Sequence, residues 1–259
     1  FFLINNMENF KNEYLIAIPS YKRSDLLLNT TLNLLQRHNI SSSKIYIFVG
    51  NEEEYLLYKD ILPKNSYYKL IIGKVGMGAI RNFITNYFRE NQKILFIDDD
   101  IRNVITFKNK KEFDDLIDLN SFIEDAFDEI SKANIKLFGI YPTDNPYFML
   151  KNPKTFDLCY IIGCFYGIIN DKSISVSLDD KEDYERSILF FLKYGNNLRY
   201  NWIAPITRYY KQKGGMQEKR TVENVYLSAK YLADKYPDLC KLKFKKKSKY
   251  AELYFFRNK

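Results

Sequence analysis

Lys93-Ile-Leu-Phe-Ile-Asp-Asp-Asp100 is the stretch that decides the fold, because a short apolar run leads directly into three acidic residues. An apolar run of this length that ends in polar residues is typical of a buried strand. Three adjacent carboxylates repel one another, and a divalent cation among them relieves the repulsion. The stretch predicts a strand that delivers Asp98, Asp99 and Asp100 to a metal site. An acidic turn that caps the next element is the alternative.

Three similar apolar runs precede this stretch, and helical patterns separate them. We expect strands at 14–19, 44–50, 69–73 and 93–97, and helices from Ser24 as N-cap to about 37, at 52–60 with Asn51 as its cap, and from 78 to about 90. Strands that alternate with helices of about ten residues form a mostly parallel sheet. Near-continuous apolar strands agree, since helices then cover both faces. The fold class predicted is α/β, with a Rossmann-like sheet.

The second half of the chain has a mixed pattern. We expect helices at 120–134, 184–194 and 222–236, strands at 136–141 and 198–204, and a long aromatic strand or hairpin at 158–170. No linker rich in Pro, Gly or Ser interrupts the pattern. We therefore expect a single domain over residues 1–240 with two functional halves, 14–107 and 108–240, followed by a basic segment, 241–259.

Ligands in an open parallel sheet bind beyond the carboxyl ends of the strands. The segments expected to meet there are 19–23, 50–52, 73–78 and 98–100. Arg81 follows the glycine-bearing loop at the start of a helix, where a phosphate or an acidic neighbour is favoured. An exposed helical residue is the alternative for Arg81.

A second acidic cluster, 179–185, opens the helix predicted at 184–194. A carboxylate at a helix start is held in place and can act as a general base on an acceptor hydroxyl. Capping of the helix dipole explains acidic residues there equally well. Further along, Gly214 and Gly215 form a turn among cations. We interpret this turn as a loop that closes over a diphosphate, or as an ordinary basic surface loop.

The net charge is +8, and residues 241–259 hold eight basic side chains against one acidic side chain. A compact basic end suits a polyanion such as nucleic acid, although a solvated flexible tail is the alternative. Three cysteines and a single histidine, His38, give neither a disulfide framework nor zinc-ligand spacing, so a reduced intracellular compartment is expected. The longest apolar runs have strand length, so no membrane span is expected. The first residues make a poor signal peptide, and Met7 is a possible natural start.

Six short segments, in this order, resemble the TET-associated glycosyltransferases, GT-A-fold enzymes of phages and related elements that are akin to the glucosyltransferase that makes base J. They are Ala17-Ile-Pro-Ser-Tyr-Lys-Arg23, Ile47-Phe-Val-Gly-Asn-Glu-Glu-Glu54, Gly76-Met-Gly-Ala-Ile-Arg-Asn82, Ile97-Asp-Asp-Asp-Ile101, Glu182-Asp-Tyr-Glu-Arg186 and Gly214-Gly-Met-Gln-Glu218. The resemblance covers about residues 14–225. It implies transfer of a sugar from a nucleotide sugar, expected to be a UDP-sugar, to a hydroxymethylated pyrimidine in DNA.

The resemblance also implies roles for single residues. Asp100 holds Mn²⁺ or Mg²⁺, and Asp98 faces either the ribose or the metal. Asp183 is the catalytic base, with Glu182 as the next candidate. Inversion is expected because one carboxylate base suffices for it. The donor-binding residues expected are Pro19, Ser20, Tyr21, Arg23, Asn51, Arg81, Asp98, Asp99, Gly214 and Gly215. The DNA-binding residues expected are Lys243, Lys245, Lys246, Lys247 and Lys249.

One departure from the family concerns the metal. Many GT-A enzymes supply a C-terminal histidine to it, whereas the only histidine here is His38. The remaining ligands are therefore expected to be diphosphate oxygens and water. Two other functions stay open: a GT-A enzyme that acts on a protein or glycan hydroxyl, and a non-catalytic nucleic-acid-binding module on a decayed transferase fold.

Overall fold

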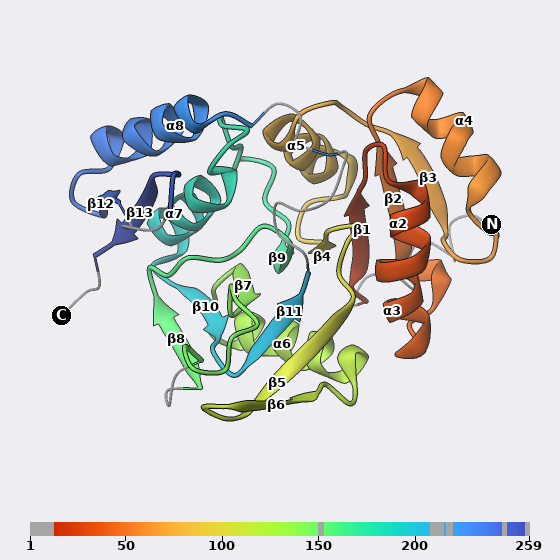
Figure 1. Ribbon diagram of the computed structural model, residues 1–259, viewed down its shortest axis with the longest axis horizontal. Helices are drawn as coiled ribbons and strands as arrows, with labels where there is room; N and C mark the ends of the chain where they lie inside the picture. The colour runs from red at the N-terminus through yellow and green to blue at the C-terminus, as the bar shows by residue number, and fades with distance from the viewer. Residues whose placement is uncertain (1–12, 150–152, 208–214, 216–219, 245–247, 257–259) are drawn as a thin grey trace.

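An eight-stranded mixed sheet forms the centre of the computed structural model, which describes residues 13–149, 153–207, 215, 220–244 and 248–256. The strand order is β3-β2-β1-β4-β9-β7-β10-β8 (Figure 1). The strands are β1 (Leu15–Pro19), β2 (Ile45–Val49), β3 (Lys69–Ile72), β4 (Lys93–Ile97), β7 (Leu137–Ile140), β8 (Lys154–Asp157), β9 (Phe165–Ile169) and β10 (Asn197–Tyr200). The first four strands run parallel, whereas β9 is antiparallel to both β4 and β7. The predicted α/β class is confirmed.

The helices of the first half follow the predicted pattern. A continuous helical segment consists of α2 (Ser24–Leu27), a π-helical stretch, η1 (Leu28–Leu32), and α3 (Asn33–Arg37). It is followed by a 3-10 turn, η2 (Ser42–Lys44), then α4 (Glu52–Ile61) and α5 (Met77–Tyr87). Asn51 caps α4 as predicted. The prediction that Ser24 is an N-cap is wrong, because Arg23 holds that position and Ser24 is already helical.

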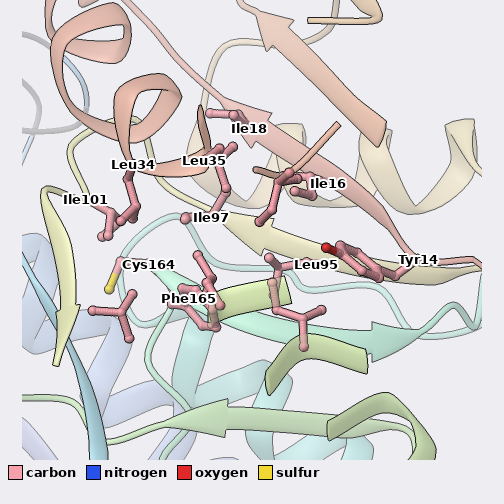
Figure 2. Close-up of a cluster of buried hydrophobic side chains, with 14 of the residues drawn as sticks. Tyr14, Ile16, Ile18, Leu34, Leu35, Leu95, Ile97, Ile101, Cys164 and Phe165 are labelled. Carbon is pink, nitrogen blue, oxygen red and sulfur yellow. The ribbon is translucent and has the colours of Figure 1, made fainter. Parts of the chain in front are cut away.

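Alternate side chains of each parallel strand enter two different cores, and helices therefore cover both faces of the sheet. On one face Ile16 and Ile18 of β1 pack with residues of α3 and α6 (Leu119–Lys132). Figure 2 shows part of this core, in which Leu34 and Leu35 of α3 lie among side chains of β1 and above those of β4 and β9. On the other face Ala17 packs with Ile80 and Ile84 of α5.

Two predictions for the second half are wrong. Residues 158–170 contain only the short strand β9, and β8, which precedes it, pairs with β10 instead. The predicted strand 198–204 is two strands, β10 and β11 (Ile203–Ile206), which belong to different sheets. Asn201 lies between them and donates its side-chain amide to Thr155 Oγ1 at 2.8 Å. A buried apolar run and a strand give the same sequence pattern, so periodicity did not separate them.

A small antiparallel sheet was not predicted from the sequence. β5 (Asn103–Asn109) lies between β11 and β6 (Glu112–Asp115) in a small antiparallel sheet. The helices α7 (Glu182–Tyr194) and α8 (Val222–Lys235) begin and end within two residues of the prediction. No helix in the described ranges is long and apolar enough to cross a membrane.

The basic end of the chain is folded where the structure describes it. β12 (Cys240–Lys243) pairs antiparallel with β13 (Glu252–Phe255), and the buried Leu253 and Phe255 pack with residues of α7 and α8. Figure 1 shows this hairpin beside α7 and α8, at the end of the molecule opposite α4. The flexible-tail alternative therefore does not hold for residues 240–244 and 248–256.

Candidate functional site

A pocket lies beyond the carboxyl ends of β1, β2 and β4, where the sequence predicted one. Its lining residues are Pro19, Ser20, Tyr21, Arg23, Phe48, Gly50, Lys74, Val75, Gly76, Met77, Ile80, Asp98, Asp99 and Gly215. Segments separated by almost 200 positions in the sequence thus meet at one place. The apolar wall and the few polar groups are typical of a small-molecule site.

The π-helical turn η1 holds the backbone of the acidic triplet. Thr30 Oγ1 donates to the carbonyl of Asp99, and Thr31 Oγ1 donates to the carbonyl of Asp98, each at 2.7 Å. Thr31 Oγ1 also accepts from the backbone N–H of Ile101 at 3.0 Å. Two consecutive threonines of one helical segment therefore fix the strand end that follows β4.

Asp99 points into a buried polar cluster at the pocket floor. Ser20 Oγ donates to Asp99 Oδ2 at 2.6 Å, and an Arg23 guanidinium nitrogen lies 3.3 Å from Asp99 Oδ1. Tyr58, an unpredicted member of the cluster, contacts Ser20 Oγ at 2.7 Å through its hydroxyl. Burial raises the pKa of Asp99 to about 7 although Arg23 opposes the rise. Asp99 therefore orders the Arg23 side chain at the pocket.

Asp100 has fewer partners than Asp99. Its nearest described cation, Arg23, lies 3.8 Å from Asp100 Oδ2. Burial, with repulsion from Asp98, raises the pKa of Asp100 to about 6, and the hydroxyl of Thr207 moderates the rise. Thr207 Oγ1 is buried, and it has no hydrogen-bond partner with normal geometry among the described residues. The raised pKa values of Asp99 and Asp100 mean that their surroundings disfavour the ionised form of each carboxyl group.

These oxygens fit Mg²⁺ or Mn²⁺. Within the described ranges no three acidic, histidine or cysteine side chains form a ready-made metal cage. Such a cage is not needed, because Mg²⁺ is usually bound by one or two carboxylates together with substrate phosphates and water. Asp98, Asp100 and the hydroxyl of Thr207 are hard oxygen donors of this kind.

Arg81 joins the acidic triplet to the start of α7. Its Nη2 donates to Asp98 Oδ1 at 2.7 Å and to the carbonyl of Gly163 at 2.9 Å. Its Nε lies 3.7 Å from Glu182 Oε1. Arg81 is buried and does not line the pocket. The sequence predicted either a phosphate or an acidic neighbour for Arg81, and the structure shows acidic neighbours.

The first turn of α5 is occupied by a carboxylate of the chain itself. Asp179 Oδ1 accepts the backbone N–H of Gly78 at 2.9 Å. The approach is close, since a Cβ on Gly78 would lie 2.5 Å from the Leu178 carbonyl oxygen. Asp179 therefore takes the place at the helix start where the sequence suggested a phosphate.

The two acidic residues that open α7 differ in their surroundings. Glu182 is buried and accepts from Arg186 Nη1 at 2.5 Å, with Arg81 on its other side. Burial raises the pKa of Glu182 although both arginines oppose the rise. Asp183 is only partly buried, and Tyr160 Oη donates to its Oδ2 at 2.5 Å. Asp183 is therefore the accessible carboxylate of the pair.

Gly163 brings this pair close to the triplet. A Cβ at position 163 would lie 2.9 Å from Glu182 Oε1 and 3.5 Å from the Cβ of Asp183. The adjacent Cys164 carbonyl accepts the backbone N–H of Asp98 at 2.9 Å. One short segment thus contacts both acidic clusters.

The remaining predicted residues have different positions. Asn51 Oδ1 accepts the backbone N–H of Glu54 at 2.9 Å as a helix cap, and Asn51 does not line the pocket. Gly215, with φ of +63°, donates its N–H to the Tyr21 carbonyl at 3.2 Å. A Cβ at position 215 would lie 2.9 Å from the Arg23 guanidinium carbon. Gly214 lies outside the described residues.

Lys74 is a pocket residue that the sequence analysis did not single out. It is exposed and lines the pocket beside Gly76 and Met77. The available signal was a cation inside the glycine-bearing loop that follows β3.

The comparison with protein families gives one match, in which the model of the TET-Associated Glycosyltransferase family covers residues 14–194. A comparison with curated proteins found no match. Among solved structures, S. aureus TarS aligns with a TM-score of 0.50 and 12% identity, over 86% of this chain and 40% of that chain. Glucosyl-3-phosphoglycerate synthase from Mycobacterium tuberculosis, in complex with phosphoglyceric acid, aligns with a TM-score of 0.51 and 8% identity, over 95% and 87%.

A second structure of TarS, residues 1–349, aligns with a TM-score of 0.49 and 13% identity. The chain spans 58% of that structure and 40% of the other TarS structure. At these identities the likeness concerns the fold, which is of the GT-A type.

Proposed function

The chain belongs to the TET-associated glycosyltransferase family, and from this premise we propose that it transfers a sugar from a nucleotide-sugar donor to a 5-hydroxymethylated pyrimidine in DNA. One observation carries the proposal: Arg81 joins Asp98, at the pocket, to Glu182, which is adjacent to Asp183. The Arg81 guanidinium thus lies between the donor pocket and the segment that carries the candidate base, Asp183. Such preorganisation is what group transfer between two bound substrates requires.

The pocket suits the nucleoside diphosphate part of a donor, for which we propose a UDP-sugar. Pro19, Tyr21 and Phe48 give flat or apolar walls, while Asp99 and Arg23 offer polar partners. Lys74 places a positive charge at the same pocket, where the phosphates need one. Gly215 lies directly over Arg23 and closes this part of the pocket.

We assign Asp98 and Asp100, with Thr207 beside them, to a Mn²⁺ or Mg²⁺ ion. A bound divalent ion neutralises the diphosphate and so stabilises it as a leaving group. Asp99 stays directed at Ser20 and Arg23 and orders the donor side of the pocket.

Asp183 is the proposed general base. It takes the proton from the hydroxymethyl oxygen as that oxygen forms a bond to the anomeric carbon, while the bond from that carbon to the diphosphate breaks. The electron pair of the broken bond leaves with the diphosphate. Displacement in one step by an oxygen on the opposite face inverts the anomeric configuration.

The test is a screen of nucleotide sugars with Mn²⁺ against DNA that contains hydroxymethylcytosine or hydroxymethyluracil, read by mass spectrometry. The expected result is a gain of one sugar per modified base, and Asp183→Asn is the matched inactive control. Transfer to a protein or glycan with no transfer to DNA would select the other acceptor class. A chain that neither binds a nucleotide sugar nor melts at a higher temperature with Mn²⁺ would be the non-catalytic module.

A further inference from the structure

The outward face of the β12–β13 hairpin carries two lysines, an aromatic ring and one partly exposed acidic residue, Glu252, which is paired with Lys243. Lys241 and Lys243 are exposed on β12, and Tyr254 is exposed on β13, where its side chain is 44% accessible. The register pairs Lys241 directly with Tyr254. The inward face holds the buried residues Cys240 and Leu253, so the alternation is that of a sheet with one face on a core and one in solvent.

The two lysines flank the Tyr254 ring. Lys241 Nζ lies 5.7 Å from the ring centroid and Lys243 Nζ lies 5.5 Å from it. Phe244 follows with 68% of its side chain exposed, and its ring centroid is 6.3 Å from that of Tyr226 on α8. Two lysines thus lie beside an accessible aromatic ring, and the single carboxylate of Glu252 offsets only part of their charge.

A chain of aromatic contacts runs from this hairpin to the proposed base. Phe255, on the inward face of β13, has its ring 5.5 Å from that of Tyr184 in the first turn of α7. Tyr184 stacks on Tyr160 at 4.2 Å, and Tyr160 donates its hydroxyl to Asp183. Figure 1 shows the hairpin next to α7, on the side away from the donor-binding strands β1 and β2. The hairpin therefore packs against the helix that carries the proposed base.

We propose that this outward face binds the DNA strand that carries the acceptor base, with Lys241 and Lys243 on its phosphates and Tyr254 stacked on a neighbouring base. The proposal rests on the proposed function and adds a surface and a binding mode to it. Lysines that contact the backbone, next to rings on which bases stack, are the common arrangement for single-stranded nucleic acid. An enzyme that acts on a base must also reach it unpaired, so an opened strand is the form expected here.

Exposed aromatic rings argue for nucleic acid over an acidic protein segment. An acidic segment needs only the lysines, whereas Tyr254 and Phe244 give flat surfaces that every base can use. Lys245, Lys246 and Lys247, predicted to contact DNA, lie outside the described residues, and the proposal does not depend on them. Lys249 is described and exposed in the same connection between the strands.

Point variants test the surface better than deletion, because residues 240–243 include β12, which packs against α8. The first variant is Lys241→Glu with Lys243→Glu, and its matched control is Lys110→Glu with Lys111→Glu at the exposed turn between β5 and β6. The measurement is fluorescence anisotropy of labelled single-stranded DNA containing hydroxymethylcytosine over a salt series. We expect binding at least about 10-fold weaker, and a slope of log K against log salt smaller by about 1.4 for two lost phosphate contacts.

The second variant separates stacking from charge. Tyr254→Ala should weaken the same DNA by about 5- to 100-fold with the salt slope unchanged, whereas Tyr254→Phe should bind within about 2-fold of wild type. Circular dichroism confirms that each variant is folded, and donor hydrolysis without acceptor should stay at the wild-type rate. Equal losses in the hairpin pair and the control pair, or wild-type affinity in both hairpin variants, would overturn the proposal.

The two levels of proposal fail in different ways. If the wild-type chain glycosylates DNA and the hairpin variants do so with unchanged KM for DNA, the surface is wrong and the function stands. If the wild-type chain modifies a protein and neither binds nor modifies DNA, both are overturned.

Discussion

Acidic residues at the two ends of the β4–β9 strand pair have opposite electrostatic surroundings. At the pocket end, burial raises the pKa of Asp99 to about 7 and that of Asp100 to about 6. At the other end, Asp171 is buried as well, and burial alone would raise its pKa. Hydrogen bonds from Lys193, Tyr194 and Ser173 outweigh burial, and the pKa of Asp171 is lowered.

The difference separates a structural carboxylate from those that we propose to bind a metal ion and the donor. Asp171 has partners that favour its charge, so it stabilises the fold by joining the end of β9 to the end of α7. Asp98 repels the charge of Asp100, and Arg23, 3.8 Å from Asp100 Oδ2, compensates that charge only in part. Acidic groups kept at a stability cost are typical of binding sites, where the ligand supplies the missing charge.

The largest expected effect is that of Asp100→Asn. We expect transfer to fall by about 10⁴-fold or more, because losing a metal ligand removes several kcal/mol of charge stabilisation, and each 1.36 kcal/mol is tenfold in rate. The free energy of unfolding should stay the same or rise, because the raised pKa means that ionised Asp100 opposes folding at neutral pH. Turnover from mass spectrometry and urea denaturation give the two quantities. A large loss of stability together with the lost activity would make Asp100 structural and break the contrast with Asp171.

Asp183→Asn tests the acceptor side of the site. We expect kcat to fall by about 10²- to 10⁴-fold, the usual contribution of a general base, with little change in donor affinity. Steady-state kinetics measure kcat, and calorimetric titration measures the affinity for the donor. Glu182→Gln is the matched control and should mainly lower stability, because Glu182 balances two buried arginines. Near-normal turnover in Asp183→Asn would place the base elsewhere.

Arg81→Met should reduce stability by about 3–5 kcal/mol, the usual cost of removing one partner of a buried ion pair. The reason is that, among the described residues, Glu182 would keep Arg186 alone as an ion-pair partner, and Asp98 would lose its hydrogen bond from Arg81. Urea denaturation measures the change, and Lys108→Met, which removes an exposed ion pair with Asp114, is the control at about 0–1 kcal/mol. An equal loss of stability in the two variants would mean that Arg81 does not hold the two acidic clusters together.

Asp171→Asn is the counterpart of Asp100→Asn at the other end of the strands. We expect a loss of about 1–3 kcal/mol at pH 7, because hydrogen bonds to a charged group are removed, and normal turnover. The folded pKa lies below the unfolded value of about 3.9. The stabilisation is therefore fully present above that value and is lost as pH falls through the folded pKa. Unfolding curves of both proteins should converge in acid, and a difference that grows on acidification would contradict this.

The sequence was most informative where local pattern and topology coincide. Strands β1 to β4, the pocket and the acidic triplet follow from apolar runs that end at polar residues, because parallel strands carry their ends to one edge. The order of the strands beyond β4 was not predictable in this way. β9 pairs with β4 and β7 through contacts that are distant in sequence, and a buried run such as 158–164 has the composition of a strand without its pairing.

Partners within the site were harder to predict than its members. Arg81 and Glu182 were both selected, yet nothing in their spacing of about 100 residues indicates that they meet in the core. Tyr160 gave no signal, because a tyrosine in an aromatic stretch has an ordinary structural explanation. Asp179 belonged to the second acidic cluster, but the sequence did not indicate that it would contact the start of α5. Such pairs depend on how the second half of the chain packs against the first.

Tyr160→Phe has the smallest expected effect and refines the contrast between the two kinds of carboxylate. Among the described side chains, Tyr160 donates a hydrogen bond to Asp183. Asp171, by contrast, accepts hydrogen bonds from three side chains. Removing the hydroxyl removes a hydrogen bond that orients Asp183 and contributes about 0.5–1.5 kcal/mol. We therefore expect kcat to fall by about 2- to 10-fold, while KM for the donor is unchanged. Steady-state kinetics measure both, and Tyr184→Phe, which keeps the stacked ring, is the control. A loss as large as that of Asp183→Asn would mean that Tyr160 itself contacts the reacting atoms, and no loss would mean that the α7 backbone alone positions the base.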